Sequence, residues 1–281
     1  IMVSSNTHTD ILFFTNKGRV YRRRGHEIIS TSRQGKGIPV GNLIDLEKGE
    51  RVVSLIGCDD YKNKYLFFAT KNGIVKRTSL EEFERINTNG KYAITFKEDD
   101  SLLNVSVTNG NALIALATDE GQLCLFNENS VRSMGRTASG VKGINTKGAT
   151  VIALATSLSG DKVFVLSENG LGKLSPLSEY RQTNRGAGGV ITIKVTEKTG
   201  KLVGMNIVHG DEDVVIITNN GTVIRTPLSQ VRECGRNSQG VKVINLKEKE
   251  SVSSFTIIPH EEENQNTENS DELVEKPAEV K

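Results

Sequence analysis

An internal repeat constrains the fold of this 281-residue chain more than any other feature. Five segments share one form: an apolar run, a polar residue followed by glycine, and a second run rich in strand-forming residues. Glycine supplies the positive φ that a tight hairpin turn requires, so each segment predicts a β-hairpin. The turn glycines recur every 48 to 55 residues and are Gly18, Gly73, Gly121, Gly170 and Gly221.

A second motif follows each hairpin at a nearly fixed distance. Four of the five copies read R-x-x-x-G-[IV], and their glycine lies 19 residues after the turn glycine. In the remaining copy the distance is 17 residues, and Ile86 stands in place of the arginine. Such constant spacing indicates one structural unit that is copied along the chain.

Each repeat contains about four short apolar stretches that predict strands. Units of this size with four strands are typical of propeller blades, and one unit has too little core to be stable alone. We therefore expect an all-β, propeller-like array of four-stranded blades over residues 1–258, with five complete repeats and a partial blade at 1–10. Helical and leucine-rich repeats are excluded, because their periods are shorter or their sequences show 3.6-residue periodicity.

Charge is unevenly distributed along the chain. The whole sequence carries 36 Lys+Arg and 34 Asp+Glu, but residues 261–281 hold eight acidic residues and only two lysines. Without that segment the balance is 34 basic to 26 acidic residues. A basic body favours nucleic acid or another polyanion as the partner, whereas the polar, acidic end predicts a disordered tail over residues 259–281.

The repeated arginine motif is the strongest candidate for a DNA contact. Binding without sequence readout depends mainly on Lys and Arg that displace counterions from phosphates, and a repeat presents such bases at regular positions. The lack of Trp and an aromatic content of 5% favour duplex backbone over stacked single strands. The first set of predicted DNA-binding residues is Arg33, Lys36, Arg136, Lys142, Arg185, Arg236 and Lys242. A second set, located after the hairpin turns, is Arg22, Arg23, Lys76, Arg77, Lys173 and Arg225.

Several stretches of the chain resemble the C-terminal domain of bacterial DNA gyrase A. They are GRVYRR, NGIVKRTSLEEF, SVRSMGRTASGVKGI, LSEYRQTNRGAGGVITIKV and SQVRECGRNSQGVKVI, and the resemblance covers residues 1 to about 258. It implies a β-pinwheel, in which each blade is completed by a strand exchanged with a neighbour. It also implies that duplex DNA is bent and wrapped around a basic outer rim, and that this domain directs negative supercoiling.

One motif of that family is missing. The gyrase-A box, Q-R-R-G-G-[KR]-G, is not matched in this chain, and the nearest stretch, at 182–188, keeps only the Gln, one Arg and two glycines in register. The partial blade at 1–10 offers an explanation, because a box-bearing blade could precede Ile1. The gene sequence upstream of Ile1 tests this expectation.

No catalytic or metal site is expected in this chain. The four histidines are scattered, and the three cysteines form neither a metal-ligand pair nor a disulfide framework. The resemblance implies an ATP-dependent type IIA DNA topoisomerase, an isomerase whose cleaving tyrosine, ATP and Mg²⁺ lie elsewhere in the holoenzyme, so no cofactor is expected here. Expected partners are double-stranded DNA, the rest of the gyrase A protein, and the gyrase B protein of the holoenzyme.

The expected location is the cytoplasm, in association with the nucleoid, because the sequence has no signal peptide. No apolar run approaches the length that a membrane span needs, so no membrane contact is expected.

Two other functions are compatible with the sequence. The C-terminal domain of the corresponding protein of topoisomerase IV, which acts in relaxation and decatenation, has a similar fold and lacks an intact box. A protein-binding propeller is an alternative of another class, in which the basic residues are solvated surface charges and the glycines serve turn geometry alone.

Overall fold

A computed structural model describes residues 3, 5–32, 34–97 and 99–260 of the chain. All regular structure in this part is strand or short 3₁₀ helix. The strands are β1 (Asp10–Thr15), β2 (Arg19–Arg24), β3 (Val52–Cys58), β4 (Tyr65–Thr70), β5 (Ile74–Ser79), β6 (Lys91–Tyr92), β7 (Leu102–Thr108), β8 (Leu113–Thr118), β9 (Gln122–Asn127), β10 (Val141–Lys142), β11 (Val151–Thr156), β12 (Lys162–Ser167), β13 (Leu171–Pro176), β14 (Val190–Ile191), β15 (Leu202–Val208), β16 (Asp213–Thr218), β17 (Val223–Pro227), β18 (Val241–Lys242) and β19 (Val252–Ile258).

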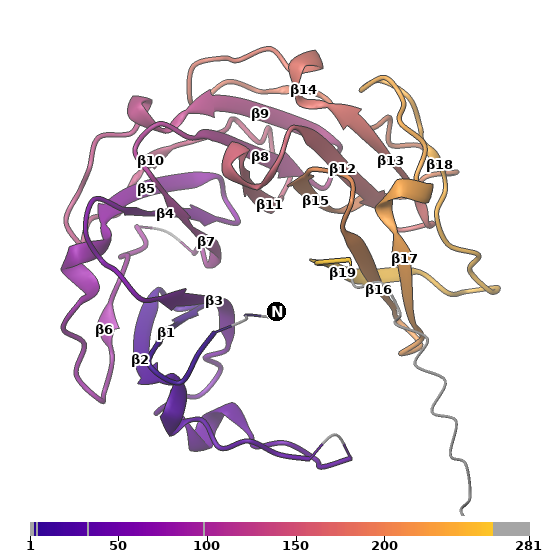
Figure 1. Cartoon of the computed structure of the whole chain (residues 1–281). Helices are drawn as coiled ribbons and strands as arrows, with labels where there is room; N and C mark the ends of the chain where they lie inside the picture. The colour runs from indigo at the N-terminus through magenta and orange to yellow at the C-terminus, as the bar shows by residue number, and fades with distance from the viewer. Residues whose placement is uncertain (1–2, 4, 33, 98, 261–281) are drawn as a thin grey trace, which may run out of the picture.

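The strands form five antiparallel sheets, or blades, placed side by side in an arc around a common centre (Figure 1). From the centre outward the sheets are β3-β1-β2-β6, β7-β4-β5-β10, β11-β8-β9-β14, β15-β12-β13-β18 and β19-β16-β17. The inner strands of neighbouring blades contact one another. The predicted all-β, propeller-like fold is therefore confirmed.

The outermost strand of each four-stranded blade comes from the next repeat. In the second blade, for example, Val141 and Lys142 of the third repeat pair with Val75 and Ile74 of β5. The strands β6, β14 and β18 complete the other blades in the same way. The strand exchange implied by the family resemblance is thus present.

The turn glycines fit both the hairpin and the exchanged segment. Gly121 has φ +74°, and a Cβ built on it would lie 2.4 Å from the carbonyl oxygen of Ile193 in the next repeat. Only glycine combines the left-handed backbone with this close approach. Gly221 of the fifth blade has the same conformation, with φ +80°, but no atom lies within 4 Å of the position of its added Cβ. Among the described residues, no strand pairs with the outer edge of β17, and its first residue, Val223, is 61% exposed.

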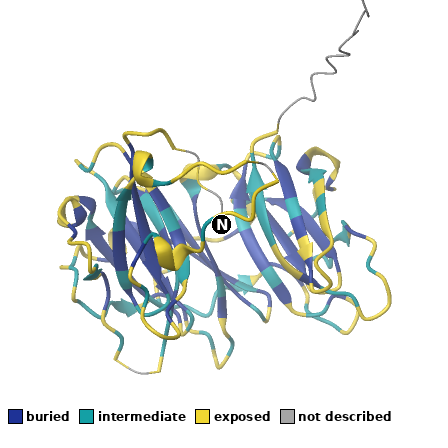
Figure 2. Ribbon diagram, turned by 90° about the horizontal axis from the view of Figure 1, so that it is seen from below, coloured by how far each residue is buried: buried dark blue, intermediate teal, exposed yellow. Residues whose placement is uncertain are grey.

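The core lies between neighbouring blades. Leu12 and Phe14 of the first blade pack against Leu66 and Phe68 of the second, and all four side chains are fully buried. The rings of Phe14 and Phe68 meet edge to face with their centroids 5.7 Å apart. Burial in Figure 2 follows this arrangement, with buried strands and exposed connecting loops. Each blade therefore depends on its neighbours for its hydrophobic stabilisation.

The two ends of the chain can be compared with the sequence predictions. Of the first ten residues, the described residues 3 and 5–9 form no strand, and Asp10 is the first residue of β1. The last described strand ends at Ile258. The predicted acidic tail from residue 261 onward lies outside the described residues.

Candidate nucleic-acid interface

Three similar loops precede the exchanged strands β10, β14 and β18 at the outer edge of the molecule (Figure 1). We call each of these loops, together with the two-residue strand that ends it, a rim loop; the three rim loops are residues 132–142, 181–191 and 232–242. Each contains one copy of the R-x-x-x-G-[IV] motif. Because they occupy the same place in successive repeats, the predicted bases are presented repeatedly along one edge of the arc.

Backbone hydrogen bonds hold each rim loop against the preceding blade. Isolated parallel bridges join Arg77 to Ser133, Leu125 to Gln182 and Leu174 to Glu233. The next amide after each bridge donates to that strand: Met134 N to Arg77 O, Thr183 N to Leu125 O and Cys234 N to Leu174 O, all at 2.8 Å. The loops are therefore anchored in one register before they reach the motif arginine.

Arg136 and Arg236 have nearly identical surroundings. The backbone N–H of Arg136 donates to Oε2 of Glu82 at 3.1 Å, and that of Arg236 donates to Oε2 of Glu179 at 2.7 Å. Both arginine side chains are partly exposed. The guanidinium of Arg236 also donates to the carbonyl of Ile191 at 3.0 Å.

Arg185 and Lys142 lie together between two repeats. The guanidinium of Arg185 donates to the carbonyl of Ser130 at 3.0 Å and to that of Lys142 at 3.3 Å. Both side chains are exposed and border a hollow of about 490 Å³, together with Lys97. Three basic side chains around one hollow suit a phosphate group, although Asp100 also lines it.

The remaining bases of the first predicted set have fewer contacts. Lys242 is exposed on β18, and Lys36 is exposed in the loop that follows β2. Arg33 lies outside the described residues.

The structure corrects part of the second predicted set. Lys76 and Lys173 are fully buried, and Arg77 is 9% exposed. The guanidinium of Arg77 lies 3.6 Å from the buried carboxylate of Glu128. These three residues are wrong as direct DNA contacts, because their strands are covered by the rim loop of the next repeat.

The other three residues of the second set reach the surface but are held by neighbours. Arg22 donates to the carbonyl of Glu84 at 2.6 Å, and Arg23 donates to that of Leu43 at 2.6 Å. Arg225 is exposed and pairs with Asp213 at 2.6 Å. A partner already occupies part of each guanidinium, so these bases are weaker candidates than the rim-loop residues.

Burial changes the acid-base behaviour of the two lysines. Desolvation lowers the pKa of Lys76 from 10.5 to about 7, against the opposing effect of Glu82. It lowers the pKa of Lys173 from 10.5 to about 8, with Cys234 and Glu179 opposing. Neither ammonium has a carboxylate as a hydrogen-bond partner among the described residues, which explains why desolvation dominates.

Sequence reasoning missed a second arginine in each rim loop. Arg132, Arg181 and Arg232 are exposed and precede the motif arginine by four residues. Their signal was this constant four-residue spacing across three repeats, which an alignment anchored on the motif glycine would have shown.

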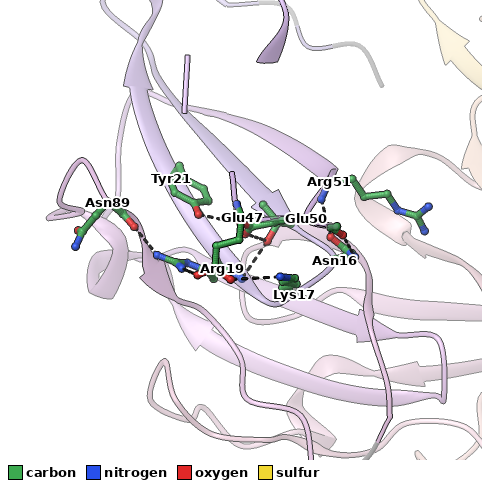
Figure 3. Close-up of polar contacts among 10 residues, drawn as sticks. Asn16, Lys17, Arg19, Tyr21, Glu47, Glu50, Arg51 and Asn89 are labelled. Carbon is green, nitrogen blue, oxygen red and sulfur yellow. Dashed lines mark hydrogen bonds and ion pairs between the residues drawn. The ribbon is translucent and has the colours of Figure 1, made fainter. Parts of the chain in front are cut away.

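Not every surface base is free for a phosphate. Figure 3 shows a polar cluster on the first blade in which Arg19 is paired with Glu47, and Lys17 approaches the same carboxylate at 3.3 Å. The hydroxyl of Tyr21 donates to Glu50 at 3.1 Å in the same cluster. The carboxylates compensate these bases, so the first blade presents less free positive charge here than the rim loops do.

Two other kinds of site are absent from the described residues. No group of three or more His, Cys, Asp or Glu side chains is placed there to hold a metal ion. No helix in the same part of the chain is long and apolar enough to cross a membrane.

Comparison with known proteins identifies relatives for nearly the whole chain. A family model described as the DNA gyrase C-terminal domain, beta-propeller, matches residues 9–59, 64–109, 112–157, 161–209 and 212–259. The DNA gyrase A protein of Staphylococcus epidermidis is 47% identical over 268 residues, which cover 94% of this chain and 30% of that protein. The DNA gyrase A protein of Mycoplasma genitalium is 46% identical over 257 residues, covering 91% of this chain and 31% of that protein. The chain thus spans less than a third of the length of these relatives.

Solved structures agree with the blade arrangement. The C-terminal domain of DNA topoisomerase IV superposes with a TM-score of 0.82 at 26% identity, covering 92% of this chain and 82% of that one. A DNA gyrase A C-terminal domain superposes with a TM-score of 0.77 at 23% identity, covering 90% and 83%. The second likeness supports the fold alone.

Proposed function

Because this chain belongs to the DNA gyrase C-terminal domain family, we propose that it binds duplex DNA without reading its sequence and bends the duplex along its outer rim. The observation that carries the proposal is that three successive rim loops each present two arginines at the same positions. Arg132, Arg181 and Arg232 are exposed, and the motif arginines Arg136, Arg185 and Arg236 are partly or fully exposed. A duplex has a continuous row of phosphates, and regularly spaced bases on a curved edge can contact that row at intervals.

Bending must be compensated by contacts. Bending a short duplex costs on the order of a few kcal/mol, and many phosphate contacts can offset that cost without any base contact. The bases that we assign to this role are Arg136, Lys142, Arg185, Arg236, Lys242 and Lys36, together with Arg132, Arg181 and Arg232.

Membership of the family also supports a wider role. We propose that the chain acts within an ATP-dependent type IIA topoisomerase, as the part of the gyrase A protein that wraps DNA and directs negative supercoiling in the cytoplasm. Strand cleavage, ATP and Mg²⁺ are assigned to other parts of the holoenzyme, so the isolated chain should bind DNA and cut nothing.

Two assays test the proposal. Fluorescence anisotropy with a labelled duplex should show binding that weakens steeply as salt increases, and absence of binding at low salt would overturn the proposal. Relaxed plasmid that is nicked and religated in the presence of the chain should change its linking number if the DNA is wrapped. An unchanged linking number would limit the function to binding.

A topoisomerase IV role is the second candidate, because the superposition on that enzyme's C-terminal domain has a TM-score of 0.82. The 47% identity to a gyrase A protein favours gyrase. The reconstituted holoenzyme distinguishes them: gyrase introduces negative supercoils with ATP, whereas topoisomerase IV relaxes and decatenates.

A further inference from the structure

The two buried lysines occupy one position in alternate blades. Lys76 is the third residue of β5, and Lys173 is the third residue of β13. The corresponding residue of β9, in the blade between them, is Cys124. A fully buried lysine is costly unless its ammonium is hydrogen-bonded, so a repeated one calls for a structural explanation.

Both lysines donate to the backbone beside a motif arginine. The ammonium of Lys76 donates to the carbonyl of Arg136 and to that of Ala93. The ammonium of Lys173 donates to the carbonyl of Gly235, the residue before Arg236, at 2.6 Å. In each case the contact reaches from one blade into the rim loop of the next repeat.

A glutamate of the preceding blade also holds this stretch of backbone. Glu82 lies in the 3₁₀ helix Leu80–Phe83 and accepts the N–H of Arg136 at 3.1 Å. Glu179 lies in the 3₁₀ helix Leu177–Glu179 and accepts the N–H of Arg236 at 2.7 Å. The peptide groups at each arginine are therefore fixed by a lysine and a glutamate of the preceding blade.

The middle rim loop, residues 181–191, lacks this pair. Cys124 stands at the lysine position, and its sulfur lies 3.5 Å from the hydroxyl of Thr183. Arg185 uses its own guanidinium to bond the carbonyls of Ser130 and Lys142. The lysine and glutamate thus occur together in the rim loops 132–142 and 232–242, where the arginine side chains also contact the preceding repeat: Arg136 Nε lies 4.0 Å from Glu82, and Arg236 donates to the carbonyl of Ile191.

We infer that Lys76 with Glu82, and Lys173 with Glu179, are positioning residues that aim Arg136 and Arg236 at the DNA backbone. This inference rests on the proposed function. The lysines do not touch DNA; they fix the backbone from which each arginine projects. A pre-positioned arginine loses less conformational freedom on binding a phosphate than one on a mobile loop.

The inference predicts that removing either glutamate weakens DNA binding, although the glutamates are negatively charged. Removing a carboxylate near a phosphate-binding loop should strengthen DNA binding if only electrostatics act. Positioning predicts the reverse: Glu82→Ala should weaken duplex binding about threefold or more, since the loop is released. Glu81→Ala is the matched control, because Glu81 is exposed in the same 3₁₀ helix and its carboxylate has no hydrogen bond or ion pair among the described residues.

A double-mutant cycle tests the lysines by anisotropy on the full chain with a labelled linear duplex. Lys76→Met and Arg136→Ala should each weaken binding about threefold to tenfold. Each should also reduce the salt slope, which is the steepness with which log K falls with log salt concentration, by about 0.9, the value for one phosphate contact. The double variant should bind no more weakly than Arg136→Ala alone, because the lysine acts through that arginine. Combining Lys76→Met with Arg236→Ala should give additive losses.

Distinct outcomes separate the two proposals. If the unsubstituted chain binds no duplex, the proposed function and this inference both fail. If it binds but Lys76→Met and Arg136→Ala are additive, or Glu82→Ala strengthens binding as Glu81→Ala does, only the positioning role is overturned. Should Lys76→Met fail to fold, the exposed Glu82 decides the question alone, with circular dichroism confirming that the variant is folded.

Discussion

The buried lysines make the stability of the protein depend on pH in an unusual direction. The folded-state pKa of Lys76 is about 7 and that of Lys173 about 8, both lowered by desolvation. In the unfolded chain a lysine retains its proton up to about pH 10.4. Between these limits the unfolded state binds more protons than the folded state, so the free energy of unfolding rises with pH.

The size of the effect follows from the two pKa values. Each pH unit above the folded pKa adds about 1.4 kcal/mol for one lysine. Between pH 7 and pH 9, Lys76 should therefore add roughly 2 to 3 kcal/mol, and Lys173 about 1 kcal/mol more. Below about pH 6 both lysines are protonated in both states, and this contribution no longer changes.

Urea unfolding followed by circular dichroism, at several values between about pH 6 and pH 9, measures this dependence. We expect the double variant Lys76→Met, Lys173→Met to lose most of the rise in unfolding free energy. Lys142→Met is the control, because that lysine is exposed. Other groups that titrate in the same interval contribute equally to the variant and to the unsubstituted chain, so their contribution to the pH dependence is removed by subtracting the two curves. An unchanged pH dependence in the double variant would show that the buried amines are not the groups responsible.

Three further results are expected. Arg185→Ala should weaken duplex binding several-fold and lower the salt slope by about 0.9, measured by anisotropy, and an unchanged slope would remove Arg185 from the interface. Gly121→Ala should destabilise the protein by more than Gly221→Ala. Both glycines have positive φ, but only at Gly121 would an added Cβ meet a carbonyl oxygen, 2.4 Å away. Equal losses of stability in thermal unfolding would contradict the role of the exchanged segment. Glu128→Ala should lower the free energy of unfolding in urea by about 3 to 5 kcal/mol. The substitution removes a fully buried carboxylate that pairs with Arg77 and accepts a hydrogen bond from the Thr108 hydroxyl at 2.7 Å. A decrease below about 1 kcal/mol would refute this reasoning.

Much of the fold could be predicted because the repeat leaves a strong local signal. A glycine such as Gly73 between two apolar runs specifies a hairpin, and five such hairpins at regular spacing specify an array of blades. The exchanged strands could not be derived in this way. A two-residue strand such as Val141–Lys142 is too short to show the alternation that marks a strand, so the exchange was available only from the family resemblance.

The site was predictable in part, for a related reason. Motif arginines such as Arg136 repeat at a fixed place, and the structure puts three of them on equivalent rim loops. The burial of Lys76 and Arg77 was not predictable, because adjacent residues of a strand point to opposite faces and one of the two normally reaches solvent. Here both are buried, since one blade packs on each side of β5 and the rim loop of the next repeat covers its outer part.

The exchange of strands also gives the molecule a direction. If one repeat opens, for example 112–157, it withdraws β10 from the blade before it but takes no strand from the blade after it. Local unfolding should therefore spread more readily toward the N-terminus than toward the C-terminus. An array of independent blades would show no such polarity. In this protein the unfolding of one repeat is therefore coupled more strongly to the repeat before it than to the repeat after it.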